Sequence, residues 1–259
     1  MGTGVMGSDH AHNLARGVRG ARLAAIADAD VPRAEALAAS LGGPRVFGDG
    51  EEMISSGAVD AVIIAAPDPF HAPLALACLE AGLPVLCEKP LVPTAAEAVE
   101  VVRAHDALPA PLMTVGFMRR FDPGYLALRD AAGVLHTVEL QVHAQYGYDV
   151  RCELVCERAS VELPPVPALV EADEVIVSTE LARRSAYPAD WRPRFAAAYR
   201  AELAAWVEAS LEHRPPEGGA TARDALRATV LAESVVRSME QDGARVAVPA
   251  VDDVLAGRA

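Results

Sequence analysis

Gly2-Thr3-Gly4-Val5-Met6-Gly7 lies at the start of the chain and fits the spacing G-x-G-x-x-G. Glycines at this spacing allow a tight turn, a close approach of the backbone to a phosphate, and close packing of the helix that follows. The motif alone is weak, but a helical stretch follows it here, and then an apolar strand that ends at Asp28. We therefore predict a phosphate-binding loop at a helix N-terminus. The alternative is an ordinary glycine turn beside a surface acid.

Asp28 indicates which ligand this loop would take. It lies 21 residues after Gly7, where an acid accepts hydrogen bonds from the adenosine ribose of a dinucleotide. A carboxylate there would repel a 2′-phosphate, so the two features together predict NAD rather than NADP. The cofactor-binding residues expected in this part of the chain are Gly2, Gly4, Val5, Met6, Gly7 and Asp28.

Short apolar runs alternate with helical patterns over the first 116 residues. Strands are predicted at 23–27, 58–65, 83–87 and 112–115, and helices at 32–41, 72–81 and 95–105. Strands that alternate with helices indicate a parallel, doubly wound sheet of the α/β class. We therefore predict an NAD-binding Rossmann domain at residues 1–116.

The pattern changes after Tyr125. Segments 134–145, 150–158, 160–163 and 173–179 resemble strands and follow one another without helices between them. This order indicates an antiparallel sheet. Two helices are predicted after it, at about 191–213 and 221–241, with Gly218-Gly219 between them. We predict that residues 117–259 form a smaller α+β domain, with a mainly antiparallel sheet, for substrate binding and oligomerisation.

The composition argues against several classes of partner. The net charge is −13 at pH 7, so nucleic acid and anionic membranes would repel the chain. No apolar run reaches the ~18 residues that a membrane helix needs, and no signal peptide is visible. The four cysteines show no C-x-x-C spacing, and no metal site is predicted. We expect a cytoplasmic enzyme that binds neither nucleic acid nor a membrane.

Three further motifs each follow a predicted strand: Ala65-Ala66-Pro67-Asp68-Pro69-Phe70-His71, Cys87-Glu88-Lys89-Pro90-Leu91 and Gly116-Phe117-Met118-Arg119-Arg120-Phe121-Asp122-Pro123-Gly124-Tyr125. Together they resemble the Gfo/Idh/MocA family of oxidoreductases, and the E-K-P motif is the strongest marker. Three segments are similar to the inositol 2-dehydrogenase branch: the motif at 116–125, Tyr146-Gly147-Tyr148-Asp149, and Asp190-Trp191-Arg192-Pro193-Arg194-Phe195. The resemblance covers nearly the whole chain.

The resemblance implies NAD-dependent oxidation of a ring hydroxyl, from myo-inositol to its 2-keto form. A dehydrogenase of another sugar or cyclic polyol and a non-catalytic dinucleotide-binding remnant are the alternatives. Lys89 is the implied catalytic residue, because its ammonium would bind the reacting oxygen. A small polyol substrate and a homo-oligomer are also implied. The implied substrate-binding residues are Lys89, Arg119, Tyr146 and Tyr148, and the implied cofactor contacts are Pro67, His71 and Glu88.

His71 keeps a second interpretation, because a buried structural histidine would fit the same position equally well. Two departures from the family pattern add further expectations. The family has an apolar strand directly before its glycine loop, and this loop begins at residue 2, so we expect the first strand of the sheet to be missing.

The second departure lies at residues 130–135, where Asp130-Ala131-Ala132 runs directly into Gly133-Val134-Leu135. The family has a long segment here, with an aspartate and a histidine that act with the lysine. We therefore expect Lys89 to be the only remaining member of the catalytic group, and the activity to be impaired.

Overall fold

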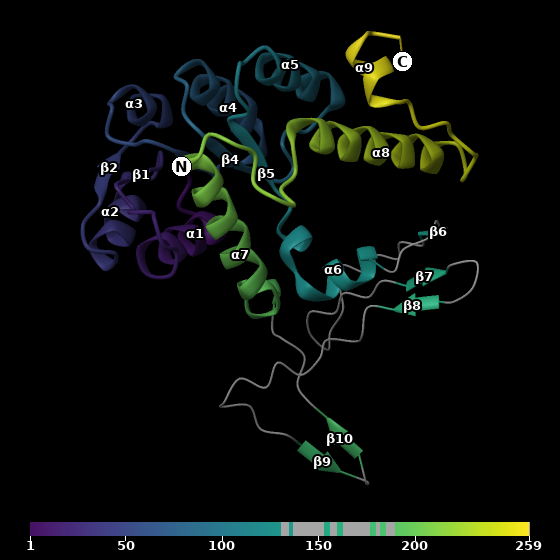
Figure 1. Cartoon of the computed structure of the whole chain (residues 1–259), viewed down its shortest axis with the longest axis horizontal. Helices are drawn as coiled ribbons and strands as arrows, with labels where there is room; N and C mark the ends of the chain where they lie inside the picture. Colours follow the sequence, from purple (N-terminus) through teal and green to yellow (C-terminus); the bar gives the residue numbers. More distant parts are fainter. Residues whose placement is uncertain are drawn as a thin grey trace. The chain divides into compact units, whose positions relative to one another are not determined.

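The computed structural model describes residues 1–130 and 190–258, together with short strands at 135–136, 153–155, 160–162, 177–179 and 182–184. The chain divides into two compact units, one made of Met1–Phe117 with Glu202–Ala259 and the other of Met118–Ala201. The first unit carries the parallel strands and the helices around them (Figure 1). Within the described residues, no helix combines the length and the hydropathy needed to cross a membrane.

Strands and helices alternate in the first unit as predicted. Its strands are β1 (Ala25–Ala27), β2 (Arg45–Phe47), β3 (Val62–Ile64), β4 (Val85–Glu88) and β5 (Met113–Gly116). Helix α1 (Val5–Arg16) precedes β1, and the helices between the strands are α2 (Val31–Ser40), α3 (Gly50–Ser55), α4 (His71–Glu80) and α5 (Ala95–Asp106). A short 3₁₀ turn, η1 (Asp68–Phe70), lies ahead of α4. The pairs β1–β2, β3–β4 and β4–β5 are all parallel, which confirms the predicted Rossmann class.

Polar side chains set the starts of several helices. Asp30 accepts a hydrogen bond from the Arg33 amide ahead of α2, at 3.1 Å, and Asp49 accepts one from the Glu52 amide ahead of α3, at 2.9 Å. Thr94 forms a reciprocal capping box with Glu97 at α5. Each cap contributes about 1 kcal/mol, so local sequence is enough to place these helix starts.

The sheet of the first unit is divided at its centre. β1 and β2 form one sheet, and β3, β4 and β5 form another. Only Met1 and Gly2 link the two: the Gly2 amide donates to the Ala27 carbonyl and the Ala65 amide donates to the Met1 carbonyl, both at 2.8 Å. Among the described residues, no strand lies between β1 and β3.

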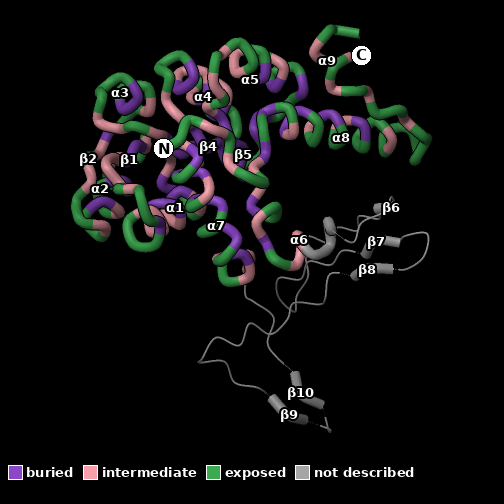
Figure 2. The backbone as a smooth tube through the Cα atoms, in the orientation of Figure 1, coloured by how far each residue is buried: buried purple, intermediate pink, exposed green. Residues whose placement is uncertain are grey.

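The core follows this division. β3, β4 and β5 are buried along their whole length, as expected for strands covered on both faces. Figure 2 shows this for β4 and β5. Their largest apolar cluster includes Ile64, Val85 and Val101 and extends to Leu226. A separate cluster on the other side of the gap joins Ile26 to Ala34 and Ala38 of α2.

The last helices belong largely to the first unit. They are α7 (Trp191–Leu211), α8 (Ala222–Glu240) and α9 (Val251–Leu255). α8 lies beside α5, and Ala220, just ahead of α8, accepts a hydrogen bond from the Val115 amide of β5 at 2.9 Å. Leu203 and Trp206 of α7 pack with Ile63 and Leu86. The sequence assigned all of residues 117–259 to a second domain, whereas residues from Glu202 onward pack with the first unit.

The described part of the second unit begins with η2 (Met118–Phe121) and α6 (Pro123–Asp130). The strands β6 (Leu135–His136), β7 (Glu153–Val155) and β8 (Ser160–Glu162) pair antiparallel, and so do β9 (Val177–Thr179) and β10 (Ala182–Arg184). The predicted antiparallel sheet is thus present in the described strands. No pattern in the sequence analysis had indicated β10.

Candidate functional site

The glycine loop has the backbone geometry that a nucleotide cradle needs. Gly2 has a positive φ of +84°, and a Cβ there would lie 2.4 Å from the Ala65 carbonyl oxygen. A Cβ on Gly7 would lie 1.9 Å from the Gly2 carbonyl oxygen, so neither position accepts a side chain. Gly4 differs, because no atom lies within 4 Å of its Cβ position. The space over Gly4 is therefore open for a ligand.

Helix α1 begins directly after Gly4, and no side chain caps it. Its first amides and the positive end of its dipole can therefore face a phosphate at the loop. Val5 is 61% exposed beside them, while Met6 is half-buried. These residues fit the predicted cofactor site, and the fit rests on backbone shape rather than on side-chain charge.

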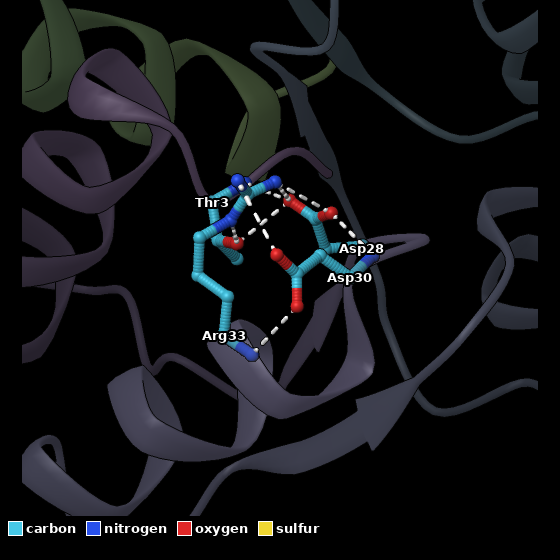
Figure 3. Close-up of polar contacts among 4 residues, drawn as sticks. All are labelled: Thr3, Asp28, Asp30 and Arg33. Carbon is cyan, nitrogen blue, oxygen red and sulfur yellow. Dashed lines mark hydrogen bonds and ion pairs between the residues drawn. The ribbon is translucent and has the colours of Figure 1, made fainter.

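Asp28 lies at the carboxyl end of β1 and contacts this loop (Figure 3). One of its oxygens, Oδ2, accepts hydrogen bonds from the amide and the hydroxyl of Thr3, each at 2.6 Å. Arg33 of α2 donates from Nη2 to both Asp28 oxygens at 2.9 Å. The Asp30 amide donates to Oδ1 at 2.8 Å. The carboxylate is thus held in place beside the glycine loop.

These contacts keep Asp28 ionised. Burial alone would raise its pKa, but the hydrogen bonds from Thr3, Asp30 and Arg33 outweigh it and lower the pKa from 3.8 to about 2. A carboxylate that is charged at every physiological pH accepts hydrogen bonds from ribose hydroxyls and repels a 2′-phosphate. Arg33 is the nearby cation that a 2′-phosphate could use, and it is already paired with Asp28.

The E-K-P motif lies at the carboxyl end of β4. The Glu88 side chain points into the protein, where its Oε1 lies 2.8 Å from Nε2 of His10, and both side chains are buried. Its Oε2 accepts a hydrogen bond from the Lys89 amide at 3.2 Å. Gly116 leaves room for it, because a Cβ there would lie 3.2 Å from the Glu88 carboxyl carbon. Glu88 therefore connects α1 with the backbone that carries Lys89.

Lys89 itself is exposed, and it is the only lysine in the chain, whose other 22 basic residues are arginines. An ammonium is a compact donor that can also release a proton, which a guanidinium cannot do. The residues before and after it are held in place: Glu88 is bonded to His10, and the Pro90 carbonyl lies 2.8 Å from Nδ1 of His71. The position implied for the catalytic residue thus lies on a fixed loop at the carboxyl edge of the sheet.

His71 has both ring nitrogens engaged by protein carbonyls. Nδ1 lies 2.8 Å from the Pro90 carbonyl, and Nε2 lies 2.7 Å from the Ala66 carbonyl. The side chain is 1% exposed. It joins the loop after β3 to the E-K-P loop, which favours its structural interpretation over direct contact with a cofactor. Pro67, by contrast, is exposed at the same edge.

Arg119, an implied substrate residue, lies in the second unit, whereas Lys89 lies in the first. The Arg119 guanidinium lies 5.6 Å from the ring centre of Tyr125 and 5.4 Å from that of Phe195. Beside them, Asp122 and Arg194 form a buried ion pair at 2.7 Å. Tyr146 and Tyr148 lie outside the described residues, so their placement stays a prediction.

Several residues of this site were missed by sequence reasoning. Thr3 occupies a variable position of the glycine motif, and Arg33 lies five residues after Asp28, so spacing could have suggested both. The His10–Glu88 pair joins residues 78 positions apart, and no local signal announces it. Glu202 of α7 is buried too, and its pKa is raised well above 4.5 by burial first and by the Glu88 charge second.

Comparison with known proteins agrees with this geometry. Residues 1–117 match the family model described as "Oxidoreductase family, NAD-binding Rossmann fold". The chain is 37% identical to "Inositol 2-dehydrogenase 1" of Saccharopolyspora erythraea, over 97% of this chain and 96% of that one. It belongs to the Gfo/Idh/MocA oxidoreductase family. As a Gfo/Idh/MocA protein it has an NAD-binding Rossmann domain, which confirms the predicted cofactor.

Other relatives also match more than nine tenths of this chain. "Inositol 2-dehydrogenase 2" of Paenarthrobacter aurescens is 34% identical over 94% of this chain and 96% of its own. Among solved structures, myo-inositol dehydrogenase of Lactobacillus casei, determined with NAD(H) and myo-inositol, has a TM-score of 0.83. That structure is 21% identical and covers 96% of each chain, so it supports the fold.

The alignments are also longer than this chain. The match to the Paenarthrobacter relative extends over 326 positions, whereas this Gfo/Idh/MocA chain has 259 residues. At least 67 aligned positions of the relative, the difference between those two lengths, therefore have no counterpart here. This agrees with the expectation that the chain is shortened relative to its family. The sequence analysis places the missing segment between residues 132 and 133.

Proposed function

We propose that this protein is an NAD-dependent dehydrogenase of a cyclic polyol, of the inositol 2-dehydrogenase type. The observation that carries the proposal is the identity of 34% and 37%, along nearly the whole chain, to relatives named inositol 2-dehydrogenase. The shape of the glycine loop and the ionised Asp28 support the proposal that NAD is the cofactor. Another cyclic polyol as substrate would use the same site.

Bound NAD⁺ supplies the hydride acceptor, and the protein binds and orients both reactants. The proposed role of Lys89 is to donate a hydrogen bond to the reacting hydroxyl oxygen, where negative charge develops as the carbon–hydrogen bond breaks. Glu88 and His10 hold the loop that carries Lys89, so we infer a positioning role for both. Arg119, Tyr146 and Tyr148 are proposed to bind the other hydroxyl groups.

We further propose that turnover is slow. Oxidation of an alcohol releases the hydroxyl proton, and a positioned acid–base residue typically contributes about 10²–10⁴ in rate. The family segment that resemblance assigns to this task is the one that the sequence analysis finds missing. To accept the hydroxyl proton, Lys89 would first have to release one of its own protons to solvent, because an ammonium can only donate.

A steady-state assay of NADH formation tests these proposals. Purified chain is mixed with NAD⁺ and myo-inositol or scyllo-inositol, and the Paenarthrobacter relative serves as a full-length control. We expect NADH formation from at least one inositol, at a rate more than about tenfold below the control. A rate within tenfold of the control would contradict slow turnover. Cofactor binding without any turnover would instead support the non-catalytic alternative.

Assembly and location are proposals of the same kind. We propose a homo-oligomer, because the family resemblance implies one, and light scattering of the purified chain would measure its mass. We propose a cytoplasmic location, because Cys78 and Cys87 are buried free thiols, as expected in a reducing compartment. A disulfide to either thiol in protein isolated without reductant would contradict it.

A further inference from the structure

Glu202 of α7 is a buried carboxyl group to which the proposed dehydrogenase site gives no role. The residue is 1% exposed, and neither of its carboxyl oxygens has a hydrogen-bond partner among the described residues. Buried polar groups without a partner are rare in native proteins, so this one requires an explanation. A negative charge on it would be costly, because nothing in the described structure replaces the water that the charge loses.

Helix packing brings Glu202 to the side of β4 that carries Glu88. Trp206 lies about one turn after Glu202 on the same face of α7, and it packs in one apolar cluster with Leu86 of β4. Leu86 and Glu88 are two residues apart on a strand, so their side chains point to the same face of the sheet. The two carboxyl groups therefore lie on the same side of β4. The Glu88 charge raises the pKa of Glu202, which agrees with this placement.

The elements that pack with α7 in this cluster bring two titratable groups toward Glu202. β4 contributes Glu88, and α1, whose Leu14 packs against the same cluster, contributes His10. β3 (Val62–Ile64) packs there too and carries only apolar side chains. Glu202 thus shares a buried region with one other carboxyl group and one imidazole.

Both oxygens of Glu88 already hold other parts of the protein. Oε1 lies 2.8 Å from Nε2 of His10, and Oε2 accepts a hydrogen bond from the Lys89 amide at 3.2 Å. These contacts are strongest for a carboxylate, which accepts at both of its oxygens. A second negative charge on Glu202 would repel Glu88, because like charges interact strongly where the dielectric constant is low. The arrangement therefore favours one ionised carboxyl group and one protonated one.

We propose that Glu202 is a positioning residue whose proton keeps Glu88 as the single buried carboxylate and so holds the E-K-P loop in place. Ionisation of Glu202 would repel Glu88 from its contacts with His10 and the Lys89 amide, and the loop would loosen. Glu202 acts on Lys89 only through Glu88. The effect on the loop is independent of the proposed dehydrogenase function, whereas the effect on turnover rests on that function.

The direction of the pH dependence follows from the burial of Glu202. Burial first, and the Glu88 charge second, raise the pKa of Glu202 well above 4.5. The folded protein therefore keeps this proton in weakly acidic solution and loses it as the pH rises through the folded pKa. The loop should be held firmly at low pH and should loosen at high pH. Glutamine carries no charge and retains a donor, so Glu202→Gln should hold the loop at every pH.

The only lysine of the chain provides a reporter on this loop. Reductive methylation with isotope-labelled formaldehyde gives Lys89 a methyl NMR signal, and Lys89→Arg identifies the signals of any other amine. In the parent we expect the Lys89 signal to show an inflection between about pH 5 and about pH 9, below the range near about 10.4 where a lysine loses its own proton. Glu202→Gln should lack this inflection, and Glu208→Gln, at an exposed position on the same helix, should retain it.

Kinetics give a second readout where NADH formation can be measured. The ratio of kcat for Glu202→Gln to kcat for the parent should rise at least about threefold from pH 6 to pH 9, while KM stays unchanged. If Glu202→Gln fails to fold, Glu202→Met, which is uncharged and of similar size, takes its place.

Three results would overturn the proposal: no inflection in the parent, an inflection that persists in Glu202→Gln, or a ratio of kcat values that does not change with pH. An inflection that depends on Glu202, in a chain that forms no NADH, would support this role and contradict the dehydrogenase function. The failure of one proposal is therefore distinguishable from the failure of the other.

Discussion

Glu202 is a buried carboxyl group on α7 whose two oxygens have no hydrogen-bond partner within the described residues. Burial raises its pKa well above 4.5, so the folded state holds this proton more tightly than the unfolded state. Its contribution to stability is present below pH 4.5 and is lost as the pH rises through the folded pKa. Glu202→Gln should therefore stabilise the protein at pH 8 by on the order of 1 kcal/mol and change little at pH 4.

Urea unfolding of the parent and the Glu202→Gln variant at the two pH values measures this difference. Glu208→Gln, at an exposed position on the same helix, is the control; it removes an ion pair with Arg214, so it should not stabilise the protein at pH 8. Equal stabilisation by Glu202→Gln at both pH values would mean that the carboxyl group is not buried as the structure has it.

Lys89 offers a second test at the residue scale. If turnover is measurable, Lys89→Ala should lower kcat by about 10²–10³, because the variant lacks the donor to the developing negative charge. NADH binding should stay within about twofold, since the glycine loop and Asp28 hold the cofactor. An unchanged kcat would remove the proposed catalytic role.

The single lysine allows a chemical version of the same experiment. Reductive methylation of the parent should place methyl groups on Lys89, and a peptide map would identify them. Bound NADH should slow this labelling. Labelling that is indifferent to NADH would place Lys89 away from the cofactor.

Local patterns were enough to predict most elements of the first unit. The apolar run at 83–87 was predicted as a strand and corresponds to β4 (Val85–Glu88). Helix α5 begins at Ala95, as predicted, after the capping box of Thr94 and Glu97. β2 was missed, since it is three residues long and begins with an exposed Arg45. Such a strand forms because its neighbour β1 is present, and not because of its own pattern.

Contacts between distant parts of the chain could not be predicted. The sequence indicated α7 and α8 as helices, but which unit they join depends on Trp206 packing near Ile63 and on α8 packing against α5. The site shows the same limit. Asp28 follows from its spacing to the glycine loop, whereas the inward pairing of Glu88 with His10 appears only in three dimensions.

At the scale of the whole molecule, the central claim is a Gfo/Idh/MocA chain that binds NAD(H) through residues 2–7 and Asp28. The chain should bind NAD(H) even if turnover is slow, because the glycine loop, α1 and Asp28 lie together in the first unit. Gly2 of this loop donates a hydrogen bond to Ala27 of β1, so NADH binding also reports whether this part of the sheet is folded.

Calorimetric titration of the purified chain with NADH and with NADPH tests this claim most directly. Asp28→Asn removes the charge, and Asp30→Asn is the matched control because asparagine caps α2 as well as aspartate does. We predict that the parent binds NADH at least about tenfold more tightly than NADPH. Asp28→Asn should lower this ratio of affinities, and Asp30→Asn should leave it unchanged. Equal or tighter binding of NADPH by the parent would contradict the account.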